Sequence, residues 1–161
     1  MSTAVTIEKA KNFDLIWPIF KKIVTETDSF IYDANISKSE AERVWMGPEV
    51  YLAKSNNSII ATFRIRPNQV QRGNHIANAS FMVDPQWQGQ GIGKMIGQFA
   101  IKKAKELGYL GMQFNMVVKH NQKSLNLWLS LGFEIIGILP KAYQMPNNSY
   151  TDAYIVFKSL E

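Results

Sequence analysis

The chain has 161 residues, 46% of them hydrophobic and 19% charged, which fits a single domain, residues 1–161, with a substantial core. Lysine and arginine outnumber aspartate and glutamate by 18 to 13, giving a formal net charge of +5. This balance suits an anionic partner, although it serves solubility equally well. The basic residues are dispersed and form no run resembling a nucleic-acid-binding arm, so we expect no nucleic-acid partner.

Several kinds of chemistry are excluded by what the sequence lacks. It has no cysteine, which removes disulfides, a thiolate nucleophile and thiolate metal sites. The two histidines, His75 and His120, lie far apart in sequence, so we predict no metal centre. No stretch approaches the roughly 20 apolar residues of a membrane span, and the polar start has no signal-peptide core. We therefore expect a cytoplasmic protein without a membrane partner.

The N-terminal part of the chain predicts scaffold elements. Hydrophobic spacing indicates, in order, a strand over 6–10, a helix over 14–26, an aperiodic loop over 27–36, a helix over 37–45, and strands over 49–54 and 59–66. Asp14 is expected to cap the first helix, with Pro18 near its first turn, and Ser37 is expected to cap the second. A polar turn over 55–58 joins the two strands as a hairpin.

The rest of the chain is organised around a strand over 76–83 that runs through a glycine-rich turn, Val83 to Gly93, into a helix over 92–107. Glycines let backbone N–H groups face inward, and a helix N-terminus adds partial positive charge. The stretch therefore predicts a phosphate-binding turn, with Gly108 closing the helix. Asn78 is a polar residue inside an otherwise apolar strand and needs a partner if buried.

Two common phosphate-binding motifs do not fit this turn. A dinucleotide fingerprint would need glycine at position 94 or 96, where the chain has Lys94 and Ile96. A nucleotide P-loop would need glycine at Gln88 and serine or threonine at Met95. Both interpretations fail.

Beyond the helix, the pattern predicts a strand over 112–118, a short helix over 121–132, and strands over 133–139 and 150–159 around a loop. Asn115 lies in the first of these strands, and Asn121 is expected to cap the short helix. The loop between the last two strands contains Pro140, Lys141 and Tyr143.

Two motifs in this part of the chain resemble those of a known superfamily. The turn follows the pattern Gln-x-x-Gly-x-Gly from Gln88 to Gly93, with Val83 and Asp84-Pro85 upstream. Further along, the chain has Asn121, Ser124, Trp128 and Gly132-Phe133. Together they resemble the acyl-CoA motifs of the GNAT N-acyltransferases, over the C-terminal two-thirds of the chain. The resemblance implies an α/β (α+β) GNAT fold, with a mixed, mostly antiparallel sheet of about six or seven strands and about four helices. It also implies an N-acetyltransferase that uses acetyl-CoA.

The resemblance assigns roles to residues of this chain. The cofactor-binding residues would be Phe81, Met82, Val83, Gln88, Gly89, Gln90, Gly91, Ile92, Gly93, Lys94, Asn121 and Ser124. The catalytic residues would be Asn115, Asn121 and Trp128, and the acceptor would contact Asn78, Tyr32, Asp33 and Tyr143. Where many members have a tyrosine that protonates the departing thiolate, this chain has Trp128, whose indole N–H donates a hydrogen bond but gives up no proton near neutral pH.

A narrower resemblance concerns the acceptor. Phe114-Asn115, 121–133, 136–140 and Asp152-Ala153 look like the acetyltransferases that act on azetidine-2-carboxylate and related small imino acids. In that group, the residue matching Asn78 binds the substrate carboxylate. A small amino or imino acid is therefore the expected acceptor, ahead of a protein N-terminus or lysine, a polyamine or an antibiotic.

Other interpretations stay open from the sequence. The tyrosine missing at Trp128 favours an acyl-CoA sensor without turnover, and positive charge alone favours a nucleic-acid-binding module. The base that deprotonates the amine could be Asp33, His75 or His120, or a water relay through Asn115 or Asn121. Exposed terminal strands are compatible with a homodimer.

Overall fold

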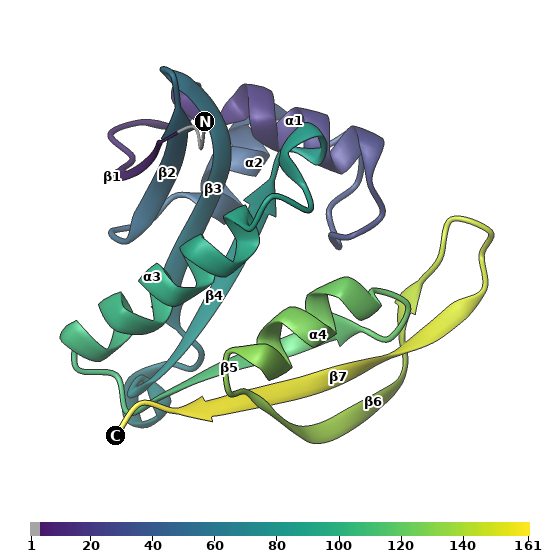
Figure 1. Cartoon of the computed structure of the whole chain (residues 1–161). Coiled ribbons are helices and arrows are strands. Elements are labelled where there is room, and N and C mark those ends of the chain that lie inside the picture. Colours follow the sequence, from purple (N-terminus) through teal and green to yellow (C-terminus); the bar gives the residue numbers. More distant parts are fainter. Residues whose placement is uncertain (1–3) are drawn as a thin grey trace. The chain divides into compact units, whose positions relative to one another are not determined.

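The computed structural model describes residues 4–161. Along the chain, its strands and helices are β1 (Val5–Lys9), α1 (Trp17–Glu26), α2 (Lys38–Trp45), β2 (Val50–Ser55), β3 (Ser58–Pro67), β4 (Ile76–Val83), α3 (Ile92–Glu106), β5 (Gly111–Val118), α4 (Gln122–Ser130), β6 (Glu134–Gln144) and β7 (Tyr150–Ser159) (Figure 1). Short 3-10 turns lie at Phe13–Leu15 (η1), Gln71–Gly73 (η2) and Pro85–Trp87 (η3).

The strands of the described residues form a seven-stranded sheet in the order β1-β2-β3-β4-β5-β7-β6. Strands β4 and β5 pair in parallel, whereas β1–β2, β2–β3, β5–β7 and β6–β7 pair antiparallel. This mixed, mostly antiparallel sheet with its helices confirms the predicted α/β GNAT fold. Residue contacts divide the chain into two compact units, one running to Ile65 and including Ser80–Ile96, the other made of Arg66–Ala79 and Gly97–Glu161.

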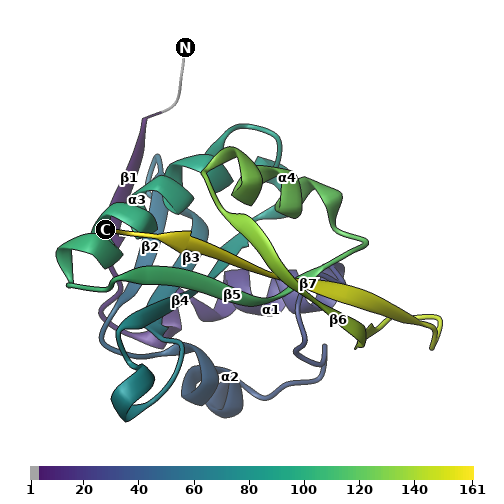
Figure 2. The ribbon, with the colours of Figure 1, turned by 90° about the horizontal axis from the view of Figure 1, so that it is seen from below.

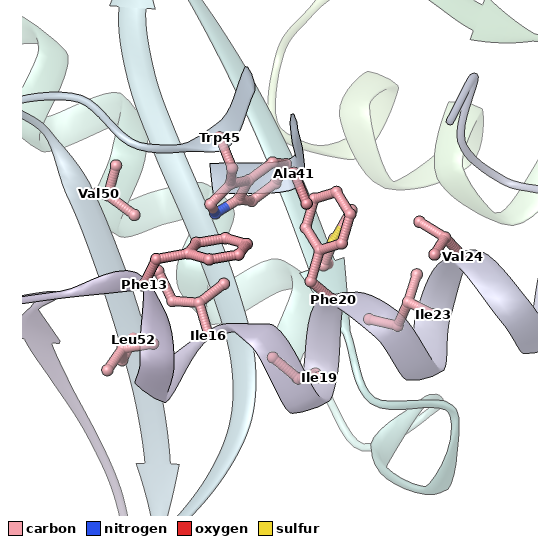
Figure 3. Close-up of a cluster of buried hydrophobic side chains, with 11 residues drawn as sticks. Phe13, Ile16, Ile19, Phe20, Ile23, Val24, Ala41, Trp45, Val50 and Leu52 are labelled. Carbon is pink, nitrogen blue, oxygen red and sulfur yellow. The ribbon is translucent and has the colours of Figure 1, made fainter. Parts of the chain in front are cut away.

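The first unit is built around an apolar cluster beneath α1 and α2 (Figure 3). Its members are Phe13, Ile16, Ile19, Phe20, Ile23, Val24, Ala41, Trp45, Val50, Leu52 and Met82. Phe20 and Trp45 meet edge to face at 5.7 Å, and the indole N–H of Trp45 donates to Thr62 Oγ1 at 3.2 Å. The indole thus buries its ring without leaving its polar atom unpaired.

The ends of the first two helices show one correct prediction and one wrong one. Ser37 caps α2, accepting from the backbone N–H of Glu40. Asp14 caps nothing, because the chain first makes the 3-10 turn η1, whose cap is Asn12. The Asp14 carboxylate instead pairs with Lys38.

The second unit packs α4 against β5 through aromatic rings. Trp128 lies 4.6 Å from Phe114 and 5.7 Å from Phe133, ring centre to ring centre. Glycine is required where α3 passes this helix, since a Cβ on Gly97 would lie 2.9 Å from Leu131 and 3.1 Å from Trp128. Close packing of α3 on α4 therefore depends on the missing side chain.

The terminal hairpin of β6 and β7 is longer than predicted (Figure 2). Strand β6 continues through Pro140, Lys141 and Tyr143, which were expected in a loop. The strand register shifts between Leu139 and Tyr143, and Lys141 has a φ of 52°. Because the backbone N–H of Lys141 donates to Asp152 Oδ1 at 2.9 Å, this irregular segment is held against β7.

The helices and the edge strand bear on two expectations, the absence of a membrane partner and the formation of a homodimer. No helix of residues 4–161 is long and apolar enough to cross a membrane. Strand β6 lies at the edge of the sheet, and its Ile135, Ile136 and Ile138 are exposed. The homodimer stays a prediction.

Candidate active site

The entry to the glycine-rich turn is fixed by Asp84, directly after β4. Its backbone N–H donates to Ile60 O at 2.8 Å, and its carboxylate accepts from the backbone N–H of Gln86 at 2.9 Å. The same carboxylate pairs with Lys22 of α1 at 2.8 Å, with both side chains largely buried. The end of β4 is therefore held by three interactions before the glycines begin.

The turn itself presents backbone amides. Gly89 and Gly91 have φ values of 74° and 81°, a conformation in which side chains are strained. The backbone N–H groups of residues 89–94 donate to no carbonyl in the described part of the chain, and the first helical bond runs from Met95 N to Gly91 O at 3.1 Å. The start of α3 is anchored by Ile92, which is 4% exposed.

These free amides have the arrangement that binds anions in other proteins. Unpaired N–H groups at a helix N-terminus carry partial positive charge, and the helix dipole adds to it. Lys94 is exposed in the first turn of α3 and has no ion-pair partner among the described residues. A Cβ on Gly89 or Gly91 would meet nothing within 4 Å, so the space over the turn is open to a ligand.

The predicted cofactor residues of β4 differ in what they expose. Met82 is 1% exposed and belongs to the core of the first unit, while Phe81 stacks on Phe63 at 5.8 Å. Phe81 and Val83 are half-buried, so of these three side chains only that of Met82 is enclosed. The parallel ladder with β5 consists of Ile76↔Gly111 and Ala77↔Met112 among the described residues.

The second unit holds four side-chain amides in one hydrogen-bonded group, hereafter the amide cluster, made of Asn68, Asn78, Gln113 and Asn115. Asn68 Oδ1 accepts from Asn78 Nδ2 at 3.2 Å and from Asn115 Nδ2 at 2.7 Å. Asn78 Nδ2 also donates to the backbone carbonyl of Gln113 at 3.1 Å, and Gln113 Nε2 donates to Asn115 Oδ1 at 3.0 Å. Asn78 is 8% exposed, whereas Asn115 is exposed.

Two members of this cluster, Gln113 and Asn68, were not predicted from the sequence, whereas Asn78 and Asn115 were. Gln113 and Asn115 lie two residues apart in β5, so strand alternation alone indicates that they share a face. Asn68 follows the end of β3, and no sequence pattern connects it with residues ten and 47 positions away.

The predicted residues of α4 contact one another. Asn121 caps the helix, its Oδ1 accepting from Ser124 N at 3.2 Å. The indole N–H of Trp128, which is 6% exposed, donates to Ser124 Oγ at 3.0 Å. Because an indole has one N–H, this hydrogen bond uses the only polar hydrogen that Trp128 has.

The remaining candidates are not members of the amide cluster. Tyr32 and Asp33 belong to the first unit and line a pocket of about 310 Å³ with Ile31, Asn35, Ile36 and Glu40. Tyr32 stacks on Phe30 at 6.3 Å and accepts a hydrogen bond from Arg64 at 3.4 Å. Tyr143 lies in β6, opposite Thr151 of β7.

Two of the three candidate bases are exposed histidines outside the amide cluster. His75 and His120 both lie on the surface. Within residues 4–161, no group of three histidine, aspartate or glutamate residues is arranged to hold a metal ion. The absence of a metal site stays a prediction.

The sequence model of the acetyltransferase (GNAT) family matches residues 11–133, more than half of the chain. The chain belongs to this family. Both the glycine-rich turn and the motif of α4 fall inside the matched GNAT region.

Known GNAT proteins resemble the chain to different extents. A GCN5-related N-acetyltransferase from Kribbella flavida is 30% identical with a TM-score of 0.89, covering 97% of this chain and 98% of that one. The N-acetyltransferase aca1 of Schizosaccharomyces pombe is 36% identical over 108 residues, 65% of this chain and 52% of its own. The chain thus spans about half the length of that curated relative. The structure of yncA from Salmonella typhimurium with its cofactor acetyl-CoA has a TM-score of 0.82 at 21% identity, covering 99% of this chain and 95% of that one, and shows the fold alone.

Proposed function

We propose that the protein is an N-acetyltransferase that transfers an acetyl group from acetyl-CoA to the amine of a small amino or imino acid. The observation that carries this proposal is the set of free backbone amides of residues 89–94 at the start of α3. Such amides favour a pyrophosphate over an uncharged ligand. Membership of the GNAT family and the acetyl-CoA of yncA support the same cofactor.

The residues of the turn fit acetyl-CoA in charge and in space. The backbone N–H of Gln88, expected among the cofactor contacts, already donates to Pro85 O at 3.4 Å. The amides of residues 89–94 therefore bind the pyrophosphate, the two left-handed glycines leave room for it, and Lys94 adds a positive charge. The net charge of +5 favours a ligand with several phosphates. When bound, acetyl-CoA supplies an activated acetyl thioester. The backbone at Phe81 to Val83 lies directly before the turn and is placed to bind the pantetheine arm and the thioester oxygen.

The acceptor is recognised by the amide cluster. Strand β4 carries Asn78 five residues before Val83 in sequence. The cluster offers neutral donors and acceptors, which bind the charged ends of an amino acid without burying a second charge. Tyr32, Asp33 and Tyr143 are further candidates for contact with the acceptor side chain.

Transfer is direct, from thioester to amine. The chain has no cysteine to carry the acetyl group, so the amine itself attacks the carbonyl. An aliphatic ammonium group with a pKa of about 10 must first lose a proton. Asparagine is not a base near neutral pH, and Asn121 therefore acts by ordering a water that carries the proton away.

The departing thiolate is stabilised from α4. Since Trp128 already donates its N–H to Ser124, we assign this role to the Ser124 hydroxyl, whose hydrogen is donated to no described residue. Trp128 supports Ser124 by fixing its oxygen. No acid is needed, because a thiol pKa of about 8.5 makes thiolate a tolerable leaving group.

A thiol-release assay tests the proposed function. Purified protein is incubated with acetyl-CoA and a panel of amino and imino acids, polyamines, an aminoglycoside and a peptide with a free N-terminus. We expect release of CoA above background with small amino or imino acids, and acetylated product by mass spectrometry. Release of CoA only with a larger amine would contradict a small amino or imino acid as the acceptor.

The second candidate function is a non-catalytic acyl-CoA sensor. It is favoured by Trp128, whose N–H is already donated within α4, at the position where many GNAT enzymes have a tyrosine. Saturable binding of acetyl-CoA by calorimetry, without thiol release for any amine, would support the sensor and contradict the enzyme.

A further inference from the structure

The amide cluster contains a buried side chain with one unused polar atom. Asn78 is 8% exposed, and its Nδ2 donates to both Asn68 Oδ1 and the backbone carbonyl of Gln113. A primary amide has two hydrogens, so both are used. The Oδ1 atom of Asn78 accepts no hydrogen bond from the described residues, and it is not among their fully enclosed unpaired atoms. This oxygen therefore keeps some contact with solvent.

The polarity of the whole cluster follows from one backbone atom. The carbonyl of Gln113 can only accept, so the Asn78 atom facing it is the nitrogen. That nitrogen also faces Asn68, whose atom there must be the oxygen. The Asn68 oxygen then requires nitrogen from Asn115, and the remaining Asn115 oxygen accepts from Gln113 Nε2. All four bonds are satisfied in this single arrangement.

The polar atoms of the amide cluster that make no hydrogen bond within it include one acceptor and several donors. Asn78 presents an acceptor, its Oδ1. Asn68 keeps both hydrogens of Nδ2, and Asn115 keeps the second hydrogen of its own Nδ2. Since Asn78 and Asn115 both donate to one oxygen of Asn68, at 3.2 and 2.7 Å, the acceptor and the donors belong to neighbouring side chains.

We propose that Asn78 Oδ1 accepts a hydrogen bond from the amine nitrogen of the substrate, while Asn68 and Asn115 donate to its carboxylate. This rests on the proposed function. It reverses the expectation that Asn78 binds the carboxylate, because both Asn78 hydrogens are already donated inside the protein. A substrate N–H bound to Asn78 fixes the direction of the nitrogen lone pair, which orients the attacking atom. An α-amino or α-imino acid has the required donor and acceptor on adjacent carbons.

Kinetics of variants with a substrate and its decarboxylated analogue distinguish whether Asn78 binds the amine or the carboxylate. The probes are azetidine-2-carboxylate and azetidine, which lacks the carboxylate; if another acid in the panel is the better substrate, that acid and its decarboxylated amine replace them. Because the amine is present in both probes, Asn78→Ala should lower kcat/KM for azetidine by about 10-fold. The loss for the acid should be at least as large, because Asn78 also orients its carboxylate donors Asn68 and Asn115. Asn68→Ala and Asn115→Ala should each lower kcat/KM for the acid by about 10-fold or more. For the amine without a carboxylate, kcat/KM should stay within about twofold of wild type.

The controls address folding and weak substrates. Asn126→Ala removes an exposed asparagine of α4 outside the cluster and should leave both probes unchanged. Asn78→Ser keeps a hydroxyl that can donate to the Gln113 carbonyl, and it replaces Asn78→Ala if that variant unfolds. If the amine is not acetylated, its inhibition constant against the acid is measured instead.

The outcome that overturns the inference is a penalty for Asn78→Ala that disappears with the amine, because Asn78 would then bind the carboxylate. Equal penalties for the two probes in Asn68→Ala and Asn115→Ala would also contradict it. Failure of the proposed function has a different signature, since wild-type protein would then acetylate none of the amines.

Discussion

Gly91→Ala tests whether the amides at the start of α3 bind CoA. Gly91 has a φ of 81°, and a Cβ there would meet nothing within 4 Å. The substitution therefore adds backbone strain without a clash, at about 1–2 kcal/mol for a left-handed non-glycine residue. For a chain of this length, 1 kcal/mol lowers Tm by about 2–4 °C.

The same helix provides a matched control. Gly108, just beyond the other end of α3, has a φ of 88° and likewise no atom within 4 Å of a built Cβ. Gly108→Ala should lower Tm by a similar amount, because the strain is the same. Only Gly91→Ala places a methyl group in the space we assign to the pyrophosphate.

The expected difference lies in cofactor binding. Losing one charge-assisted hydrogen bond costs about 1.5–3 kcal/mol, so Gly91→Ala should raise the Kd for CoA by about 10- to 100-fold, measured by calorimetry. Gly108→Ala should bind like wild type. If the two variants bind CoA equally well, the amides before Lys94 do not hold the pyrophosphate, and the proposed site is wrong.

The remaining predictions concern α4 and the packing of the second unit. Ser124→Ala should lower kcat by about 10- to 100-fold, the cost of losing a hydrogen bond to a charged group. Adding Trp128→Phe to it should lower kcat little further, because Trp128 acts through Ser124; additive losses in steady-state kinetics would contradict this. Gly111→Ala should lower stability by about 1–3 kcal/mol, since its Cβ would lie 2.6 Å from the Phe157 ring. Gly137→Ala, with its nearest neighbour at 3.5 Å, should unfold close to wild type in denaturant titrations.

Local patterns were sufficient to predict the elements that carry the cofactor site. Strand β4 has the predicted bounds, Ile76–Val83, because a mostly apolar run, interrupted only by Asn78 and Ser80, ends at a proline and a glycine-rich turn. The caps Ser37 and Asn121 lie where side-chain chemistry required them. The bond from Trp128 to Ser124 was also within reach, since residues four apart share a helix face.

What could not be predicted depends on contacts distant in sequence. Pro140 and Lys141 look like loop residues, yet β6 continues through them because Asp152, 11 residues away, holds the backbone of Lys141. Asn68 joins the amide cluster only because β4 and β5 come together in the fold. No period in the sequence encodes such a meeting, so Asn68 was missed.

Burial explains why the cluster is made of amides and not of charges. Asn78 is 8% exposed. An arginine at this position would bind a carboxylate tightly, but burying its guanidinium would cost solvation free energy that only a permanently bound anion could offset. An amide avoids that cost, and its usefulness then depends entirely on which atom faces outward. In this protein the Gln113 carbonyl fixes the orientation of the Asn78 amide, and Asn78 in turn fixes the orientation of the Asn68 and Asn115 amides. Under the proposed assignment, the distinction between amine and carboxylate is therefore fixed by the backbone of β5.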